Sequence, residues 1–205
     1  HVAPLAQLVH DKTSGNPFFA IQFLSALFEE GLLTFEPIER RWSWDVTRIE
    51  AKNYTDNVVN LMVRKLTRLA PETQNALEQL ACFGNRAEFT MLRVVYQDSM
   101  PQLHAHLAEA VSAGLISCSA DSYFFLHDRV QEAAYSQIPL ETRADTHLRI
   151  GMLMSSHTDP DKLEEGIFEI VNQLNRGSHL VTSIIGRERI AQLNLTAGRR
   201  AKNSA

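Results

Sequence analysis

Apolar residues recur every three to four positions along most of the chain, which is the spacing of helices with one buried face. The clearest early example runs from Pro17 to about Glu30 and follows a shorter amphipathic helix at Leu5–Lys12. Asn16 can cap the longer helix, Pro17 suits its first turn, and Gly31 is a natural C-terminal stop. Its predicted buried stripe comprises Phe19, Phe23, Ala26 and Leu27.

Two short segments then change from helical spacing to the alternation of a strand. Leu32–Phe35 and Arg41–Trp44 predict a small β-hairpin near 32–45. Trp42 and Trp44 alternate with polar neighbours, as in a strand that has one buried face.

Helical spacing returns at Asp56, which can cap a helix that runs to Leu69. From Pro71 onward the pattern predicts three helices and then two strands joined by a short polar turn. This order is typical of a winged helix, and a further helix begins after it at Arg129. The three helices and two strands are expected at Glu72–Phe83, Glu88–Tyr96, Pro101–Ala113, Leu115–Ser119 and Tyr123–Leu126.

Three more helices are predicted in the last third of the chain. The final one has alanines at four-residue steps from Ala197 to Ala205, a spacing that lets helices pack closely, as in helical hairpin repeats. We therefore expect a mainly α fold, with helices and a small β-hairpin in 1–70, a winged-helix domain in 71–156 and the first TPR-like helical hairpin in 157–205. The three helices are expected at Thr142–Ser156, Leu163–Arg176 and Arg187–Ala205.

Composition and charge narrow the classes of partner. The 205 residues are 44% hydrophobic, and the net charge of -4 argues against nucleic acids and anionic membranes. No apolar run approaches the roughly 18 residues of a membrane helix. Cys82 and Cys118 belong to no Cys-x-x-Cys pair, which suits the reducing cytoplasm. The chain opens with His1 and ends within a helical pattern, so we expect it to be a piece of a larger protein.

The motifs of complete active sites do not occur in this sequence. There is no G-x-x-x-x-G-K-[ST] phosphate-binding loop, no G-x-S-x-G elbow and no H-E-x-x-H helix. His104 and His106 are two residues apart on a predicted helix, so they point in different directions and cannot share a metal ion. We therefore expect no catalytic residues, no bound metal and no ATP hydrolysis by this chain alone.

Three stretches match the pattern of a known class of proteins. They are KTSGNPFF (12–19), TDNVV (55–59) running on to Leu69, and FLHDRVQEAAY (125–135). In this order and spacing they resemble the signalling ATPases with numerous domains (STAND), which are AAA-related. The likeness is greatest to the ATPase module inside large bacterial and fungal sensor kinases, which carry a serine/threonine-kinase-like domain in front and a histidine kinase behind. It covers nearly the whole chain and implies the lid, winged helix and first helical repeats that follow a phosphate-binding core.

The resemblance also implies nucleotide contacts at two helix starts. Gly15–Pro17 matches a Gly-x-Pro motif at the start of a lid helix, where the proline ring lies against the adenine base. Leu126–Asp128 matches a hydrophobic-His-Asp motif, whose histidine reaches the β-phosphate of ADP in the resting state, while Asp128 would cap the next helix. The implied nucleotide-binding residues are Gly15, Asn16, Pro17, His127 and Asp128.

Simpler interpretations of both helix starts stay open at this point. Gly15–Pro17 is also an ordinary turn with a capped helix, and His127 can satisfy hydrogen bonds within a strand-to-helix turn. The phosphate-binding loop that would complete the site does not occur in the chain.

The resemblance implies a nucleotide-sensing switch between ATP and ADP, with Mg²⁺, in a parent protein that is an ATPase and a histidine-type protein kinase. We expect no nucleotide to bind tightly to this chain alone. The expected partners are the upstream nucleotide-binding core of the same chain and a protein on the helical repeats, with no DNA and no membrane. The alternatives are a helical protein–protein interaction module and DNA binding by the winged helix. DNA binding is disfavoured because the predicted third helix, Pro101–Ala113, contains no lysine or arginine.

Overall fold

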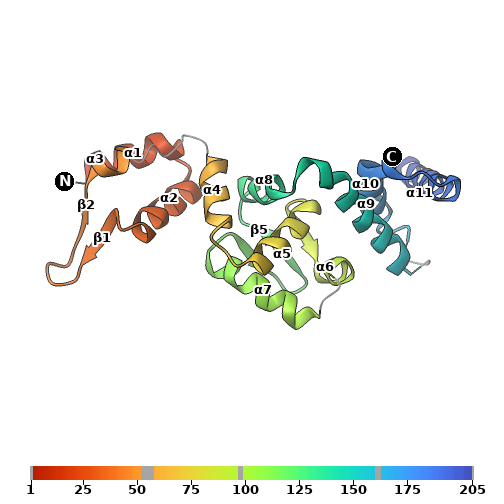
Figure 1. Cartoon of the computed structure of the whole chain (residues 1–205), viewed down its shortest axis with the longest axis horizontal. Coiled ribbons are helices and arrows are strands. Elements are labelled where there is room, and N and C mark those ends of the chain that lie inside the picture. Colours follow the sequence, from red (N-terminus) through yellow and green to blue (C-terminus); the bar gives the residue numbers. More distant parts are fainter. Residues whose placement is uncertain (1, 52–57, 97–98, 160–162, 205) are drawn as a thin grey trace. The chain divides into compact units, whose positions relative to one another are not determined.

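The computed structural model describes residues 2–51, 58–96, 99–159 and 163–204. These residues are mainly helical and carry two small antiparallel sheets, which confirms the predicted mainly α fold with a small β-hairpin. The chain divides into two compact units, His1–Arg68 and Leu69–Ala205, and each is described by itself (Figure 1). The predicted helix cap at Asp56 lies outside the described residues.

The first unit contains four helices and one hairpin among its described residues. They are α1 (Ala3–Thr13), α2 (Pro17–Glu29), β1 (Leu33–Glu36), β2 (Arg41–Trp44), α3 (Val46–Ala51) and α4 (Val58–Leu66). Helix α2 begins at Pro17 as predicted, and Phe23 and Leu27 of its apolar stripe are almost completely buried. Gly31 has a φ of 66°, a conformation that favours glycine, and it follows the helix end as predicted.

The hairpin of the first unit has one apolar face. Leu33 is opposite Trp44 and Phe35 is opposite Trp42, so these four side chains lie on the same face of the two strands. Asp45 follows β2, and its Oδ1 accepts backbone N–H groups at 2.9 and 3.3 Å at the start of α3, a helix that the spacing had not predicted. The buried cluster of this unit comprises Leu5, Phe23, Leu27, Leu32, Leu33 and Ile49.

The second unit begins with helices around a three-stranded sheet. Its first elements are α5 (Pro71–Cys82), β3 (Arg86–Glu88), α6 (Phe89–Tyr96), α7 (Met100–Ser112), β4 (Ile116–Cys118), β5 (Ser122–Phe125) and α8 (Asp128–Gln137). The sheet is antiparallel in the order β3–β5–β4, and the two strands predicted within 115–126 are confirmed. The prediction that a helix begins at Glu88 was wrong, because residues 86–88 pair with β5 and the helix begins at Phe89. Three residues are too few to show the alternation of a strand.

Helices make up the rest of the second unit, as predicted. They are α9 (Leu140–His157), α10 (Ile167–Gly177), the short 3₁₀ helix η2 (Ser178–Leu180) and α11 (Ile184–Asn203). Helix α10 begins at Ile167 rather than at the predicted Leu163, because 163–166 form turns that end at Gly166. Helix α11 begins three residues before the predicted Arg187, because Ser183 Oγ caps it by accepting a backbone N–H at 3.1 Å.

Two glycines bring α9 and α10 unusually close. A Cβ atom on Gly177 would lie 2.2 Å from the carbonyl oxygen of Ala144, and one on Gly151 would lie 2.8 Å from Leu174 Cγ. Side chains at either position would therefore separate the helices. Both helices contribute to a buried cluster that runs from the end of α5 to α11. This cluster comprises Cys82, Val95, Ile138, Ile150, Met154, Ile167, Ile170, Val171, Leu174, Val181, Ile190, Leu193 and Ala197.

Candidate functional site

The first predicted nucleotide contact is the turn that joins α1 to α2. The chain leaves α1 through two left-handed residues, Ser14 (φ 51°) and Gly15 (φ 72°). Asn16 Oδ1 then accepts the backbone N–H groups of Phe18 and Phe19 at 3.0 and 3.3 Å. The side chain of Asn16 thus caps α2 as predicted and fixes the path by which the chain enters the helix.

Pro17 is the first residue of α2, and it is exposed to solvent. Its ring costs no hydrogen bond there, because the first N–H groups of a helix have no partner within the helix. A Cβ on Gly15 would lie 3.3 Å from the His10 ring, so the turn passes close to α1. The result is an exposed apolar ring held in a fixed position at a helix start.

Lys65 on α4 is a polar contact of α2 that the sequence interpretation missed. Its Nζ donates a hydrogen bond to Gln22 Oε1 at 2.5 Å, and the Gln22 side chain is buried. Burial lowers the pKa of Lys65, while the nearby Glu29 carboxylate opposes that effect. A signal was present in the spacing, because Lys65 stands four residues after Leu61 within an otherwise apolar stripe.

The second predicted contact is the start of α8, where the structure corrects the identity of the capping residue. His127, and not Asp128, is the N-cap, because His127 Nδ1 accepts the backbone N–H of Arg129 at 3.1 Å. A capping residue needs extended backbone, and His127 has it (φ -156°, ψ 143°) as the chain leaves β5. Asp128 is the first residue of the helix and is exposed. Its negative charge interacts favourably there with the positive end of the helix dipole.

The capping bond determines which nitrogen of His127 carries the proton. A backbone N–H can only donate, so Nδ1 must offer its lone pair, and the neutral ring then carries its hydrogen on Nε2. The N–H donor of the neutral ring is therefore on the opposite side from the capping nitrogen. A donor at a helix N-terminus suits an anion such as phosphate.

Two further hydrogen bonds hold the start of α8 in place. The backbone N–H of Leu126 donates to the carbonyl of Leu115 at 3.1 Å, which ties the end of β5 to the chain before β4. Gln131 Nε2 donates to the carbonyl of Ala81 at 2.8 Å, which ties the first turns of α8 to α5. His127 thus stands on a helix start that is fixed from two sides.

The five predicted residues therefore form two groups. Gly15, Asn16 and Pro17 share one turn of the first unit. His127 and Asp128 share one helix start of the second unit. The structure defines the local geometry of each group within its own unit.

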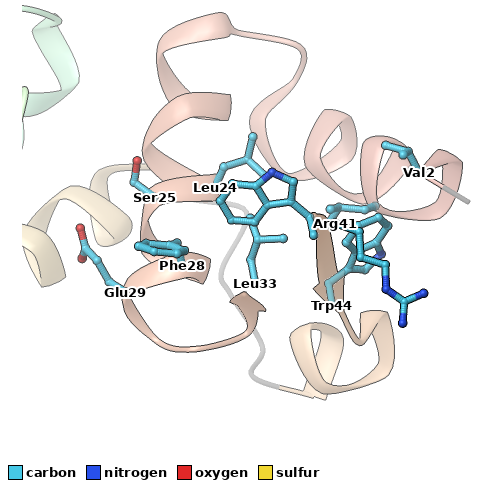
Figure 2. Close-up of a pocket in the computed structure, with 10 residues that line it drawn as sticks. Val2, Leu24, Ser25, Phe28, Glu29, Leu33, Arg41 and Trp44 are labelled. Carbon is cyan, nitrogen blue, oxygen red and sulfur yellow. The ribbon is translucent and has the colours of Figure 1, made fainter. Parts of the chain in front are cut away.

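An apolar groove in the first unit was not predicted (Figure 2). It has a volume of about 1030 Å³, with Ser25 and Glu29 toward one end and Arg41 toward the other. The rings of Phe28 and Trp42 meet edge to face with centroids 5.8 Å apart, although each side chain is about half exposed. The groove is lined by Val2, Leu5, Leu24, Ser25, Phe28, Glu29, Leu33, Arg41, Trp42 and Trp44.

The two histidines of α7 have separate partners. His104 Nδ1 bonds to the hydroxyl of Tyr123 at 2.5 Å, and His106 Nδ1 bonds to the hydroxyl of Tyr96 at 2.9 Å. Within residues 2–51, 58–96, 99–159 and 163–204, no group of three or more His, Cys, Asp or Glu side chains could hold a metal ion. In the same part of the chain, no helix is both long enough and apolar enough to cross a membrane.

One comparison with known proteins found a relative that takes part in signalling. The chain is similar to part of hybrid signal transduction histidine kinase G from Dictyostelium discoideum, with 29% identity over 253 aligned residues. The alignment covers 98% of this chain and 7% of that protein, so the chain spans a small fraction of its relative's length. No protein-family model matches the chain. No solved structure matches it either.

Proposed function

We propose that this chain is the nucleotide-sensing part of a signalling ATPase module within a larger histidine kinase, and that it switches between ATP-bound and ADP-bound states. The similarity to a segment of a hybrid signal transduction histidine kinase supports the signalling context. The two helix starts that carry the STAND-like motifs support the nucleotide-sensing role. The chain contributes no catalytic residue in this proposal, and the phosphate-binding core lies upstream in the parent protein.

The observation that carries the proposal is the hydrogen bonding of His127. Histidine is not among the residues that cap helices best, which are Asn, Asp and Ser. At the start of α8 it caps through Nδ1 and so carries a hydrogen on Nε2. Capping through Nδ1 thus does not use the Nε2 hydrogen, and a contact to the β-phosphate of ADP requires a donor.

In the proposed resting state, ADP and Mg²⁺ occupy the upstream core of the parent protein. Pro17 lies against the adenine base, and Gly15 and Asn16 fix the position of its ring. His127 donates to the β-phosphate, and Asp128 stabilises the helix start that presents it. Loss of these contacts would release the two units from the core and turn signalling on.

The arrangement of the second unit supports the same proposal. Its helix, strand, helix, helix, strand, strand order from α5 to β5 supports our proposal that it is a winged helix. Helices α10 and α11 follow as a hairpin, the expected start of helical repeats. Because α7 contains no lysine or arginine, we assign this winged helix to the nucleotide switch rather than to DNA.

The test uses His127→Ser in the full-length parent, because serine keeps a capping oxygen but removes the Nε2 donor. One hydrogen bond to a charged group contributes roughly 1.5–3 kcal/mol, so ADP release should become about tenfold to a hundredfold faster. Basal kinase signalling should rise with it. The ADP off-rate is measured by displacement of a fluorescent analogue, and the melting temperature of the same variant should stay close to that of the wild type.

His127→Ala is the matched control, because it removes both the cap and the donor. It should speed ADP release to the same extent and also cost about 1 kcal/mol of stability. An unchanged off-rate in His127→Ser would show that His127 is only a helix cap, and it would remove this residue from the site.

A second candidate function is a protein–protein interaction module, and the apolar groove of the first unit favours it. Exposed aromatic side chains such as Phe28 and Trp42 are typical anchors at protein interfaces. Nucleotide measurements separate the two candidates, because an interaction module would leave ADP affinity unchanged when Pro17 or His127 is replaced.

A further inference from the structure

A row of hydrogen bonds, buried at His147 and Gln173, joins four helices of the second unit. The Tyr135 hydroxyl on α8 lies 2.9 Å from His147 Nε2 on α9, and His147 Nδ1 lies 2.5 Å from Gln173 Oε1 on α10. Gln173 Nε2 donates in turn to the carbonyl of Cys82, the last residue of α5, at 2.8 Å. His147 and Gln173 are almost completely buried, with 1% and 3% of their surface exposed. We call this row the His147 relay.

The neutral His147 ring with its hydrogen on Nδ1 satisfies every bond of the relay. The Gln173 amide nitrogen donates to a carbonyl, so the Gln173 oxygen faces the imidazole and can only accept. His147 Nδ1 must therefore carry a hydrogen and donate it to Gln173. Nε2 is then free of hydrogen in the neutral ring and accepts the Tyr135 hydroxyl. A doubly protonated ring would direct its Nε2 hydrogen toward the nearby Arg176 guanidinium, which cannot accept it, and would require the Tyr135 hydroxyl to turn from donor to acceptor.

The charged groups that act on His147 oppose its protonation. Arg176 on α10 places Nη1 3.4 Å from His147 Nε2, and Arg143 on α9 lies over the Tyr135 ring at 4.7 Å from its centroid. Burial, followed by these two cations, lowers the pKa of His147, although the bond to Gln173 works in the other direction.

Cys82, the last residue of the relay, does not change its charge near neutral pH. Burial raises the pKa of the Cys82 thiol to about 12, so it stays protonated. The other charged groups that act there are Glu78 on α5 and Arg149 on α9, together with the same two arginines. His147 is therefore the group of the relay whose protonation can link it to pH.

We propose that the His147 relay is a pH-sensitive latch, which holds the α9–α10 pair against α5 and α8 while His147 is neutral and releases it when His147 is protonated. The α9–α10 contact itself is fixed by the close approach at Gly151 and Gly177. Release of the latch therefore weakens two other bonds of the relay. One joins Tyr135 on α8 to α9, and the other joins Gln173 on α10 to α5. Since His127 caps α8, the latch controls how firmly the helix that His127 begins is tied to the helices that follow.

The direction and size of the effect follow from linkage between protonation and opening. A lowered pKa in the closed state means that the latch has its full strength above the ordinary histidine value of about 6.5 and loses strength as pH falls below it. In the open state His147 is exposed to solvent, and its pKa returns to the ordinary histidine value. The opening equilibrium constant should therefore rise by up to about tenfold between pH 7.5 and pH 5.5.

The experiment measures amide hydrogen exchange along the 205-residue chain at both pH values, corrected for the intrinsic pH dependence of exchange. Protection in the second half of α8 and in α9 and α10 should fall by up to about tenfold at pH 5.5. His147→Gln cannot take a proton, so its protection should be equal at the two pH values. His157→Gln is the matched control, because His157 is an exposed histidine at the end of the same helix, and it should behave as the wild type.

A second measurement covers the case in which His147→Gln does not fold. Nitrogen-15 spectra of the wild-type imidazole should show the hydrogen of His147 on Nδ1 at pH 7.5, and loss of that state should coincide with the loss of protection. A hydrogen on Nε2 at pH 7.5 would overturn the proposal. Protection of α8 to α10 that does not change with pH in the wild type, or that falls equally in His147→Gln, would also overturn it.

Discussion

The two units of this chain use their side chains in different ways. In the second unit, α9 and α10 meet at glycines, and a buried histidine and glutamine satisfy each other's hydrogen bonds. In the first unit, the Trp42 ring contacts the rings of Phe28 and Phe35, and all three side chains stay about half exposed. Phe28 and Trp42 line the open groove. Tight contacts fix the positions of helices, whereas an exposed aromatic face is suited to contact with another surface.

This difference indicates where each unit tolerates change. A side chain added between α9 and α10 has no free volume to enter, so the second unit should be sensitive to packing changes of a single carbon atom. The first unit should depend more on the local hydrogen bonds that begin its helices, because much of its aromatic surface is not buried.

The largest expected effect is that of Gly177→Ala. Its new Cβ would lie 2.2 Å from the Ala144 carbonyl oxygen and 2.6 Å from Leu148 Cβ, and neither backbone can move without separating α9 from α10. We expect a loss of about 3 kcal/mol in the free energy of unfolding of the second unit. Urea denaturation followed by the helical circular dichroism signal measures it.

Gly198→Ala provides the control for that prediction. Gly198 is exposed on α11, and a Cβ there would meet nothing within 4 Å. Because alanine favours helices over glycine, this change should raise stability by roughly 0.5–1 kcal/mol. Equal effects at the two positions would contradict the close contact between α9 and α10.

A smaller effect is expected for Asn16→Ala in the first unit. The substitution removes the oxygen that accepts the N–H groups of Phe18 and Phe19, so stability should fall by about 1 kcal/mol. The chain has two tryptophans, Trp42 and Trp44, and both line the groove of this unit, so their fluorescence during urea denaturation reports on it.

Asn16→Ser tests whether capping is the cause. Serine is also a good N-cap, so stability should stay within a few tenths of a kcal/mol of the wild type. A serine variant as unstable as the alanine variant would mean that Asn16 acts through contacts other than its cap.

Where the sequence carried strong local signals, the predicted elements match the structure. Helix α2 has a capping asparagine, a proline in its first turn and a glycine after its end, and its bounds agree with the prediction to within one residue. For α11, the prediction took no account of a capping residue before the helix, and it therefore began the helix three residues late. Ser183 before Ile184 is the local signal that would have corrected it.

Other features depend on partners far along the chain and could not be predicted from local pattern. Strand β3 exists because Ala87 pairs with Tyr123, and its three residues give no periodic signal of their own. The cap of α8 was assigned to Asp128 because aspartate is a preferred capping residue, whereas the extended backbone that a cap needs belongs to His127. The contact between His147 and Gln173 joins residues 26 positions apart, so only the packing of α9 on α10 reveals it.

The smallest expected effect concerns the turns of the two hairpins. In the first unit, the turn exposes Ile38 almost completely, whereas in the second unit Asp121 accepts hydrogen bonds from the hydroxyls of Ser122 and Ser119 at 3.0 and 3.1 Å. These bonds, more than the nearby Arg86 guanidinium, lower the pKa of Asp121.

Two substitutions separate the effects of hydrogen bonding and of charge on the pKa of Asp121. The carboxylate is favoured in the folded state, so its contribution is fully present above the ordinary aspartate pKa and is lost as pH falls through the lowered value. Ser119→Ala removes one hydrogen bond, and Arg86→Gln removes the charge 3.1 Å away. In a carbon-13 NMR titration of the Asp121 carboxyl, Ser119→Ala should raise the midpoint more than Arg86→Gln does, because solvent screens an exposed ion pair. A larger rise in Arg86→Gln would mean that charge, and not hydrogen bonding, holds this turn.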